Sequence, residues 1–169
     1  HLNYKNSEIR IKHSAEVNKL LGQPVTFDAA RLGSYAHRVR SYWTNLASPE
    51  RLQRIINKVE RCSKMVSEIL ESYHEAQRDV KDYPPQYICN TGEGEMKALP
   101  TLMATQGSYA YRNHGKGMLW NNQTRHYEEP CADERERAMG YLTGTTAAPE
   151  LAESERCKIL GNAMDMYAM

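Results

Sequence analysis

The longest periodic pattern in the chain covers residues 48–80 and constrains the fold more than any other feature. Its apolar residues recur at intervals of three and four, as on one face of an α-helix: Leu52, Ile55, Ile56, Val59, Cys62, Val66, Ile69, Leu70 and Tyr73. Ser48 can cap the first turn, Pro49 suits the first helical position, and Glu50 lies at the positive end of the helix dipole. The pattern predicts one amphipathic helix, or two in line, that ends before the prolines at 84 and 85.

Shorter elements are predicted before this helix. Residues 13–22 predict a short helix with Ser14 as its N-cap and Gly22 as its stop. Residues 25–29 alternate in the manner of a strand, and a loop that leads into a second strand is expected over residues 31–43.

Further short elements are predicted after the helix. Residues 82–99 are rich in turn formers and predict a loop. Residues 100–106 and 117–121 are expected to be short strands, and residues 132–140 and 152–166 to be short helices. The chain is therefore expected to mix helices and strands.

The composition excludes several classes of protein. The 169 residues fit one domain, or most of one with a small insertion, and are 40% hydrophobic and 25% charged. No apolar run is long enough to predict a membrane span. The four cysteines lack metal-ligand spacing, so no metal site is expected. The first residues contain neither a starting Met nor a signal-peptide core, so we expect an internal part of a longer chain.

Basic residues are concentrated in one section, although the formal net charge is only +1. The section contains eight cations: Arg31, Arg38, Arg40, Arg51, Arg54, Lys58, Arg61 and Lys64. Such a section could follow the phosphates of a nucleic acid, or it could be the solvated face of a helix. Charge alone favours the solvated face of a helix.

Three blocks of sequence resemble, in order, the C-terminal motifs of the cytosine-C5 DNA methyltransferases. The first block, residues 24–46, contains a strand, a His-Arg-x-Arg pair, aromatic residues and Asn-Leu, and is similar to motif VIII of the de novo and plant domains-rearranged branch. The resemblance places Arg40 at the position whose guanidinium faces the flipped cytosine and bonds its O2. A fixed planar donor there stabilises charge that develops on the base, so Arg40 is the implied catalytic residue.

The same resemblance implies contacts to double-stranded DNA. Arg38 is expected either to contact the DNA backbone or to pack inside the protein. From the basic section, Arg51, Arg54 and Lys58 are also predicted to bind DNA, because a helix can present part of that section to the phosphates.

The second block, residues 99–112 with 117–141, resembles motif IX. That motif typically ends in Arg-Glu-x-x-Arg-x-x-Gly-Tyr/Phe-Pro and is mainly structural in the family. The matching residues are Glu134, Arg137, Gly140 and Tyr141. Asp133 replaces the usual Arg, and Leu142 replaces the usual Pro.

The third block, residues 155–169, resembles motif X, which completes the S-adenosylmethionine site. Gly161 and Asn162 match its Leu-Gly-Asn-Ser core, and Ala163 replaces the Ser. Both matching residues are therefore candidate cofactor contacts. A Gly-Asn pair can also end a helix, and the two roles are compatible.

Cys131 follows a proline, as the nucleophile of the family does, but its surroundings differ. The family's Pro-Cys is followed by Gln or Asn, whereas Ala132 follows here. A nucleophilic thiolate also needs a positive environment, and this stretch is acidic. Cys131 is not expected to be the nucleophile.

The resemblance implies an α/β fold with a partial Rossmann-like methyltransferase sheet. Residues 1–46 and 100–169 are expected to form part of the catalytic domain, and residues 47–99 a helical insert that recognises the target. The sequence lacks the Phe-x-Gly-x-Gly, Pro-Cys-Gln/Asn and Glu-Asn-Val motifs. We therefore expect a fragment of a nuclear DNA (cytosine-5)-methyltransferase whose catalytic half lies elsewhere in the same polypeptide.

Two alternatives remain open at this point. The chain could be a catalytically inactive methyltransferase-like module, such as a retroelement-borne segment, that binds DNA or a partner. It could also be a small helical structural protein whose motif matches are coincidental.

Overall fold

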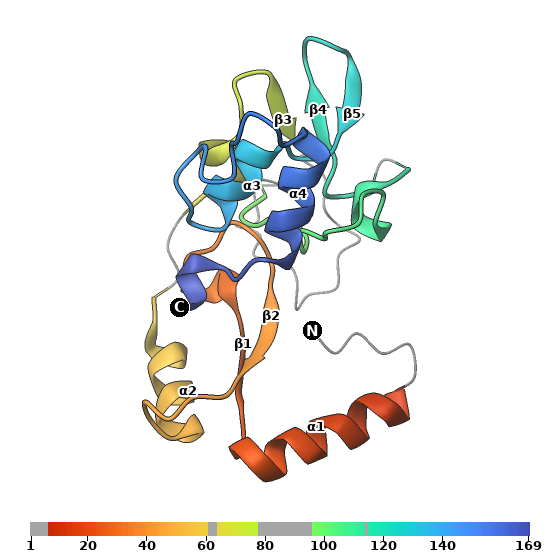
Figure 1. Cartoon of the computed structure of the whole chain (residues 1–169). Coiled ribbons are helices and arrows are strands. Elements are labelled where there is room, and N and C mark those ends of the chain that lie inside the picture. The colour runs from red at the N-terminus through yellow and green to blue at the C-terminus, as the bar shows by residue number, and fades with distance from the viewer. Residues whose placement is uncertain (1–6, 61–63, 78–95, 114) are drawn as a thin grey trace. The chain divides into compact units, whose positions relative to one another are not determined.

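The computed structural model describes residues 7–60, 64–77, 96–113 and 115–169 (Figure 1). The chain forms two compact units. The first contains residues 1–27 and 39–59, and the second contains residues 28–38 and 60–169.

The described residues of the first unit and its boundary form two helices and two short strands. Helix α1 covers Ser7–Leu21 and helix α2 covers Pro49–Lys58, while strands β1 (Val25–Asp28) and β2 (Val39–Tyr42) pair in a two-stranded sheet. The rings of Phe27 and Tyr42 stack with their centroids 4.6 Å apart. The two predicted strands are confirmed.

The predicted end of α1 is confirmed, but its predicted start is wrong. The chain leaves the helix at Gly22, whose φ of +81° is costly for any residue with a Cβ, as predicted. The helix already begins at Ser7, so the predicted cap at Ser14 is wrong.

Helix α2 begins as predicted but is much shorter than predicted. The Ser48 Oγ accepts a hydrogen bond from the Arg51 N–H (3.3 Å), and Pro49 opens the helix. The helix ends at Lys58. Downstream, the chain forms a 3-10 helix at Val66–Ile69 and then strand β3 (His74–Ala76). The long helix predicted to residue 80 is therefore wrong.

The second unit is built on a three-stranded antiparallel sheet. Strand β3 pairs with β4 (Leu119–Asn121), which pairs in turn with β5 (His126–Glu128). The strand predicted at 117–121 is confirmed. Residues 100–106 form no strand, although Leu99 makes an isolated parallel bridge to Ala36. Most of the loop predicted at 82–99 lies outside the described residues.

Two α-helices of the second unit confirm the predicted C-terminal helices. Helix α3 covers Ala132–Ala138 and helix α4 covers Glu153–Asn162, and the two helices contact each other. The predicted continuation of the last helix to 166 is interrupted after Asn162, and a 3-10 helix follows at Met166–Ala168.

The core of the second unit gathers side chains from its helices, strands and loops. Its fully buried large apolar residues are Leu99, Leu102, Leu119, Met139 and Leu160. The 3-10 helix at Val66–Ile69 contributes both of its end residues to this core. Of the apolar residues that suggested a continuous long helix, Val66 and Ile69 are thus buried in a separate short element, whereas Ile55 on α2 is 53% exposed.

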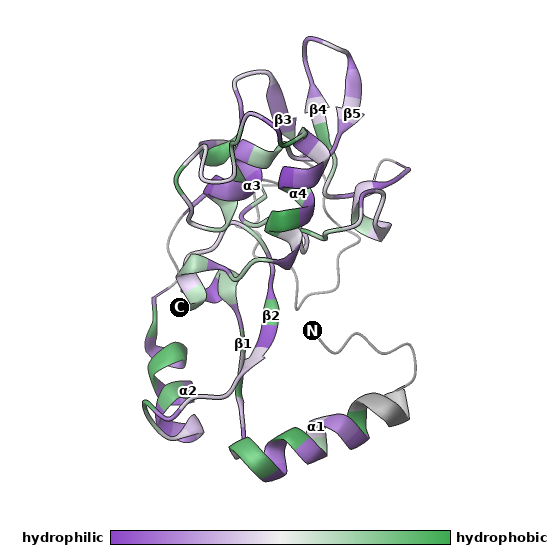
Figure 2. Cartoon of the chain, viewed as in Figure 1, coloured by the Kyte–Doolittle hydropathy of each residue, from purple (hydrophilic) through white to green (hydrophobic). Residues whose placement is uncertain are grey.

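Helix α3 is hydrophilic along most of its length (Figure 2). Most of its residues are nevertheless buried. Glu134, Arg135 and Glu136 are each exposed by 1% or less. Burying three consecutive charged side chains is costly unless each one is paired and hydrogen-bonded. The partners of these residues therefore determine the local structure.

None of the helices in the described part of the chain is long and apolar enough to cross a membrane.

Candidate functional site

Arg38 is buried where the motif VIII-like and motif X-like segments meet. Only 3% of the residue is exposed. Its guanidinium donates to the carbonyl oxygens of Leu102 (3.4 Å), Gly161 (3.1 Å) and Ala163 (2.5 Å). A guanidinium so placed inside the protein does not reach a phosphate. The expected DNA contact is not compatible with this burial, and Arg38 is a packing residue that joins the two segments.

Arg40 lies on β2 and is half-buried. Its Nη1 donates to the carbonyl of the neighbouring Val39 (2.7 Å). Arg40 belongs to the first unit, whereas Gly161 and Asn162 belong to the second. The base-facing role of Arg40 stays a prediction.

Gly161 packs against backbone. A Cβ at this position would lie 2.1 Å from the Ala104 nitrogen and 2.4 Å from the carbonyl carbon of Met103. Only a glycine permits this close approach of α4 to the loop. The predicted cofactor contact of Gly161 remains untested, but its packing role is evident.

Asn162, the last residue of α4, is exposed. Its Nδ2 donates to the Lys158 carbonyl (3.2 Å) one turn earlier in the helix. This geometry leaves the amide group accessible to a ligand. Of the two motif X matches, Asn162 is the one whose side chain is suited to a polar contact with a cofactor.

Glu134, the central residue of the motif IX-like block, holds three segments together. Its Oε1 accepts from the Glu71 N–H (2.9 Å) and lies 2.7 Å from His74 Nδ1, while its Oε2 accepts from the Cys131 N–H (2.8 Å). His74 is itself buried, and its Nε2 lies 3.5 Å from the Glu128 carboxylate. Glu134 therefore fixes β3 and the start of α3 at once, in keeping with a structural role.

Arg137 makes a parallel connection on the same helix. Its Nε donates to the Ile69 carbonyl (2.7 Å), and its Nη2 pairs with the Glu71 carboxylate (2.6 Å). Both partners lie between α2 and β3 in the sequence. Glu134 and Arg137, two of the four motif IX matches, thus attach α3 to residues 69–74.

Gly140 and Tyr141, the other two matches, contact the C-terminal segment. Gly140 has a φ of +81°, and a Cβ there would meet the Tyr167 ring at 2.9 Å. The Tyr141 hydroxyl donates to the Met164 carbonyl (2.5 Å). The motif IX-like and motif X-like blocks are therefore in direct contact.

Arg135 is a buried site residue that the sequence interpretation missed. Its guanidinium donates to the Pro130 carbonyl (2.8 Å) and the Met103 carbonyl (3.1 Å), and pairs with Glu129 (2.6 Å). No sequence signal distinguishes this arginine from a solvent-exposed one within a run of charged residues.

Glu136 was also missed, and it organises the turn after α3. It accepts hydrogen bonds from the Gly144 and Thr146 N–H groups (2.5 and 2.7 Å) and from the Thr146 hydroxyl (2.6 Å). Burial alone would raise the pKa of Glu136, but these hydrogen bonds, with one from Arg156, hold the pKa below its usual value.

Arg156 connects α4 to α3 through their charged side chains. Its Nη2 lies 2.5 Å from the Asp133 carboxylate and 3.3 Å from that of Glu136. Asp133, which stands where the motif IX pattern has an arginine, therefore forms an ion pair with Arg156.

A buried polar cluster that the sequence interpretation missed joins residues 34, 64 and 165. The Ser34 Oγ donates to Asp165 Oδ2 (2.6 Å), and both residues are fully buried. Lys64, also buried, donates to the Ser34 carbonyl. Burial raises the pKa of Asp165, although the hydrogen bonds from Ser34 and Tyr167 and the charges of Arg38 and Lys64 oppose the rise.

Cys131 has the environment of an inert thiol. It occupies the N-cap position of α3. Burial, together with the nearby carboxylates of Glu134 and Glu153, raises the pKa of the thiol to about 12. The interpretation that Cys131 is not a nucleophile agrees with this environment.

The predicted phosphate-binding section is divided by burial. Lys64 is buried like Arg38, and Arg61 lies outside the described residues. The cations of α2 are exposed, and their spacing places them along one side of the helix. These residues, named the α2 cations below, are Arg51, Arg54 and Lys58.

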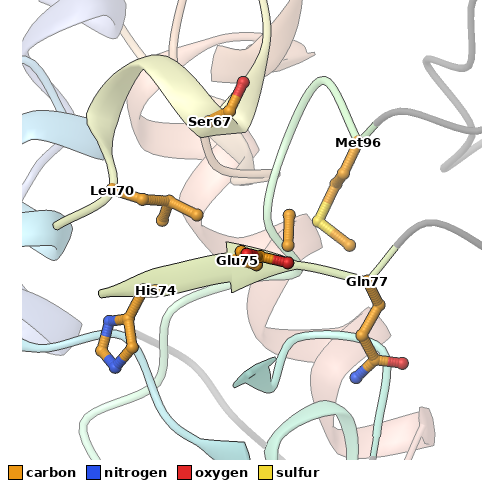
Figure 3. A pocket seen from close by; sticks show the side chains of 7 residues that line it. Ser67, Leu70, His74, Glu75, Gln77 and Met96 are labelled. Atoms are coloured by element: carbon orange, nitrogen blue, oxygen red, sulfur yellow. The ribbon is translucent and has the colours of Figure 1, made fainter. Parts of the chain in front are cut away.

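A hollow of about 130 Å³ lies beside β3. Leu70, Ser67 and Met96 line it from one side of the strand, while the His74 ring projects to the other side (Figure 3). None of its lining residues is a predicted site residue. The hollow therefore gives no support to the predicted cofactor or base contacts.

Comparison with known proteins gives a structural likeness. No protein-family model matches the sequence, and no curated protein matches it. The fold is similar to the crystal structure of S. pombe Dnmt2 methyltransferase, with a TM-score of 0.58 and 14% sequence identity over 98% of this chain. The chain spans 60% of that structure. The likeness confirms the predicted α/β class and shows that the chain has a methyltransferase fold.

Proposed function

We propose that the chain is part of a DNA (cytosine-5)-methyltransferase, which in its complete form methylates C5 of a flipped cytosine. The observation that carries the proposal is the methyltransferase fold, together with three motif-like blocks in the order of the family. Contacts join these blocks: Arg38 binds the Gly161 carbonyl, and Tyr141 binds the Met164 carbonyl.

The proposed role of Arg40 follows from the chemistry of the reaction. Attack by a cysteine at C6 moves negative charge onto O2 and N3 of the cytosine, and the proposal assigns that cysteine to the missing catalytic half. A guanidinium beside O2 stabilises this charge as it develops, which lowers the barrier. The extrahelical base requires a pocket, so the proposal pairs Arg40 with DNA that has been locally opened.

The cofactor contact is assigned to Asn162. S-adenosylmethionine would supply the methyl group when bound. The Asn162 amide is exposed and carries both a donor and an acceptor, so it fits a polar contact to such a ligand. Gly161 fits less well as a direct contact, because the Ala104 backbone fills the space where its Cβ would lie.

The α2 cations are assigned to the phosphates of double-stranded DNA, and a nuclear location follows from this proposed substrate. They are exposed and share one side of the helix, and phosphate contacts supply most of the affinity of such proteins.

An inactive methyltransferase-like module is the second candidate. The absence of the nucleophile and cofactor-loop motifs from the sequence favours it. The third interpretation, a small helical structural protein, does not fit the sheets or the methyltransferase fold.

The test measures methyl transfer to cytosine-containing DNA by the chain alone and by the full-length enzyme. We expect no transfer by the chain alone, because no residue in it fills the nucleophile role. We expect transfer by the full-length enzyme, and its loss in Arg40→Ala. DNA binding without S-adenosylmethionine binding by the full-length protein would favour the inactive module. Transfer by the chain alone that is lost in Cys131→Ser would overturn the assignment of the nucleophile.

A further inference from the structure

Asn162 has an exposed side chain on a backbone that is fixed on both sides. The carbonyls of its neighbours Gly161 and Ala163 both accept from the same nitrogen of Arg38, at 3.1 and 2.5 Å. Behind Gly161, the Ala104 backbone leaves no space for movement of the helix toward the loop. One buried guanidinium thus determines where the end of α4 lies.

A second anchor lies three residues further on. Asp165 is fully buried, and its two oxygens bind different segments: Oδ2 accepts from the Ser34 hydroxyl (2.6 Å) and Oδ1 from the Tyr167 N–H (3.0 Å). The Ser34 Oγ in turn accepts from the Ala36 N–H (3.1 Å). The chain after α4 is therefore bonded to the segment that leads into β2.

The charges of Lys64 and Asp165 favour one packing of this segment. The ammonium group of Lys64 donates to the Ser34 carbonyl and lies 4.6 Å from the centroid of the Tyr35 ring and 5.7 Å from that of the Tyr167 ring. A buried carboxylate is costly unless it is hydrogen-bonded and near cations, and Asp165 has both. Any other packing of the segment would break these contacts inside the core.

We infer that Arg38 and the Ser34–Asp165 pair are positioning residues that hold the backbone around Asn162, so that its exposed amide is presented to S-adenosylmethionine in one orientation. The inference rests on the proposed function, because the cofactor contact is what gives this orientation a use. A binding group needs supporting residues that fix its geometry, and these residues supply that support through the backbone.

The anchoring is tested by amide hydrogen exchange in the 169-residue chain. Ser34→Ala and Asp165→Asn should each speed exchange at residues 161–168 by roughly tenfold or more, because each loses a buried charge-assisted hydrogen bond. The double variant should resemble the single ones, since both changes break the same bond.

Glu136→Gln is the matched control, because Glu136 is an equally buried carboxylate whose hydrogen bonds go to residues 144, 146 and 156. It should speed exchange in residues 142–146 and leave residues 161–168 unchanged. Equal acceleration of both segments in Asp165→Asn and in the control would mean general destabilisation and would overturn the inference.

The cofactor role is tested in the full-length enzyme with Arg38→Lys and Arg40→Lys. Arg38→Lys should raise the Kd for S-adenosylmethionine roughly ten- to a hundredfold, the effect expected for losing hydrogen bonds from a charged donor, and should change kcat little. Arg40→Lys should lower kcat and leave the cofactor Kd unchanged. An unchanged cofactor Kd in Arg38→Lys and in Asp165→Asn would overturn the inference.

The failure of the proposed function would look different. Wild-type full-length protein would then fail to bind S-adenosylmethionine at all, and the cofactor role of Asn162 would fall with it. The exchange pattern of the chain alone would still decide whether these residues anchor the segment.

Discussion

Replacing Gly161 with alanine should destabilise the chain, although the same change in an open helix would stabilise it. An alanine inside a helix is favoured over glycine by about 1 kcal/mol, because glycine loses more backbone freedom on folding. At residue 161 the new Cβ would lie 2.1 Å from the Ala104 nitrogen and 2.4 Å from two further backbone atoms. The sign of the effect therefore depends on whether the neighbouring backbone can move.

The required movement sets the magnitude. Ordinary van der Waals contact begins near 3.4 Å, so the loop and the helix must separate by about 1.3 Å. Arg38 donates to carbonyls on both sides of this contact, at Leu102 and Gly161, and resists the separation. We expect the free energy of unfolding to fall by about 3 kcal/mol, the upper part of the range for overpacked sites.

Urea denaturation followed by circular dichroism measures this change, with Gly144→Ala as the matched control. Gly144 has a φ of +86° and open space around its Cα, so alanine there should cost only about 1–2 kcal/mol of backbone strain. A Gly161→Ala variant that is as stable as the wild type, or more stable, would refute the close approach of α4 to residues 103 and 104.

Four further predictions concern residues away from this contact. In the full-length enzyme, Arg40→Ala should lower the rate of methylation by roughly a hundred- to a thousandfold with little change in DNA affinity, and an equal loss of both would show that Arg40 is only a backbone contact. Charge reversal of all the α2 cations should make the slope of log DNA affinity against log salt concentration less negative by about 3. An unchanged slope would contradict their assignment to the DNA phosphates. Cys131 should react with iodoacetamide at pH 8 far more slowly in the folded chain than in urea, because its thiol pKa is raised to about 12, and equal rates would be inconsistent with its burial. Burial tends to raise the pKa of Asp28, but hydrogen bonds from His37 and backbone N–H groups outweigh it and lower the pKa below 3.8. The stability that this gives is present above pH 3.8 and is lost as pH falls through the folded-state pKa, so Asp28→Asn should flatten the acid side of the stability curve.

The sequence predicted local elements better than their extent. Caps and stops have local causes, so the start of α2 at Ser48–Pro49 and the end of α1 at Gly22 were predictable. The end of α2 at Lys58 was not predictable, because the apolar residues after it keep the helical spacing. The burial of Val66 and Ile69 in a 3-10 helix is decided by the core of the second unit, which periodicity does not describe.

The two arginines of the motif VIII-like block illustrate a second limit. Residues two apart on a strand point to the same face, so strand periodicity cannot separate Arg38 from Arg40. Arg38 precedes the first residue of β2 and binds carbonyls in the core, whereas Arg40 lies within the strand. The partners of Arg38 lie more than 60 residues away in the chain, at Leu102 and Gly161. No local pattern could identify them.

The burial of the charged residues of α3 also could not be predicted from the local sequence pattern. A run of alternating acids and bases usually indicates a solvent-exposed helix. Here three of these residues are buried, because backbone N–H and carbonyl groups from distant loops satisfy them. Only the resemblance to motif IX pointed to Glu134 and Arg137.

The Asp133–Arg156 pair has a consequence for exchanging segments between this chain and proteins with the motif IX pattern. That pattern, which residues 117–141 resemble, has an arginine where Asp133 lies. A hybrid that took α3 from such a protein and kept α4 from this chain would bring that arginine against the Arg156 guanidinium, which is largely buried and now 2.5 Å from a carboxylate. Two like charges at that distance repel, and the arginine would find no acid in place of Asp133. Helices α3 and α4 should therefore be exchanged only together. A hybrid protein is expected to keep its fold when both helices come from the same protein.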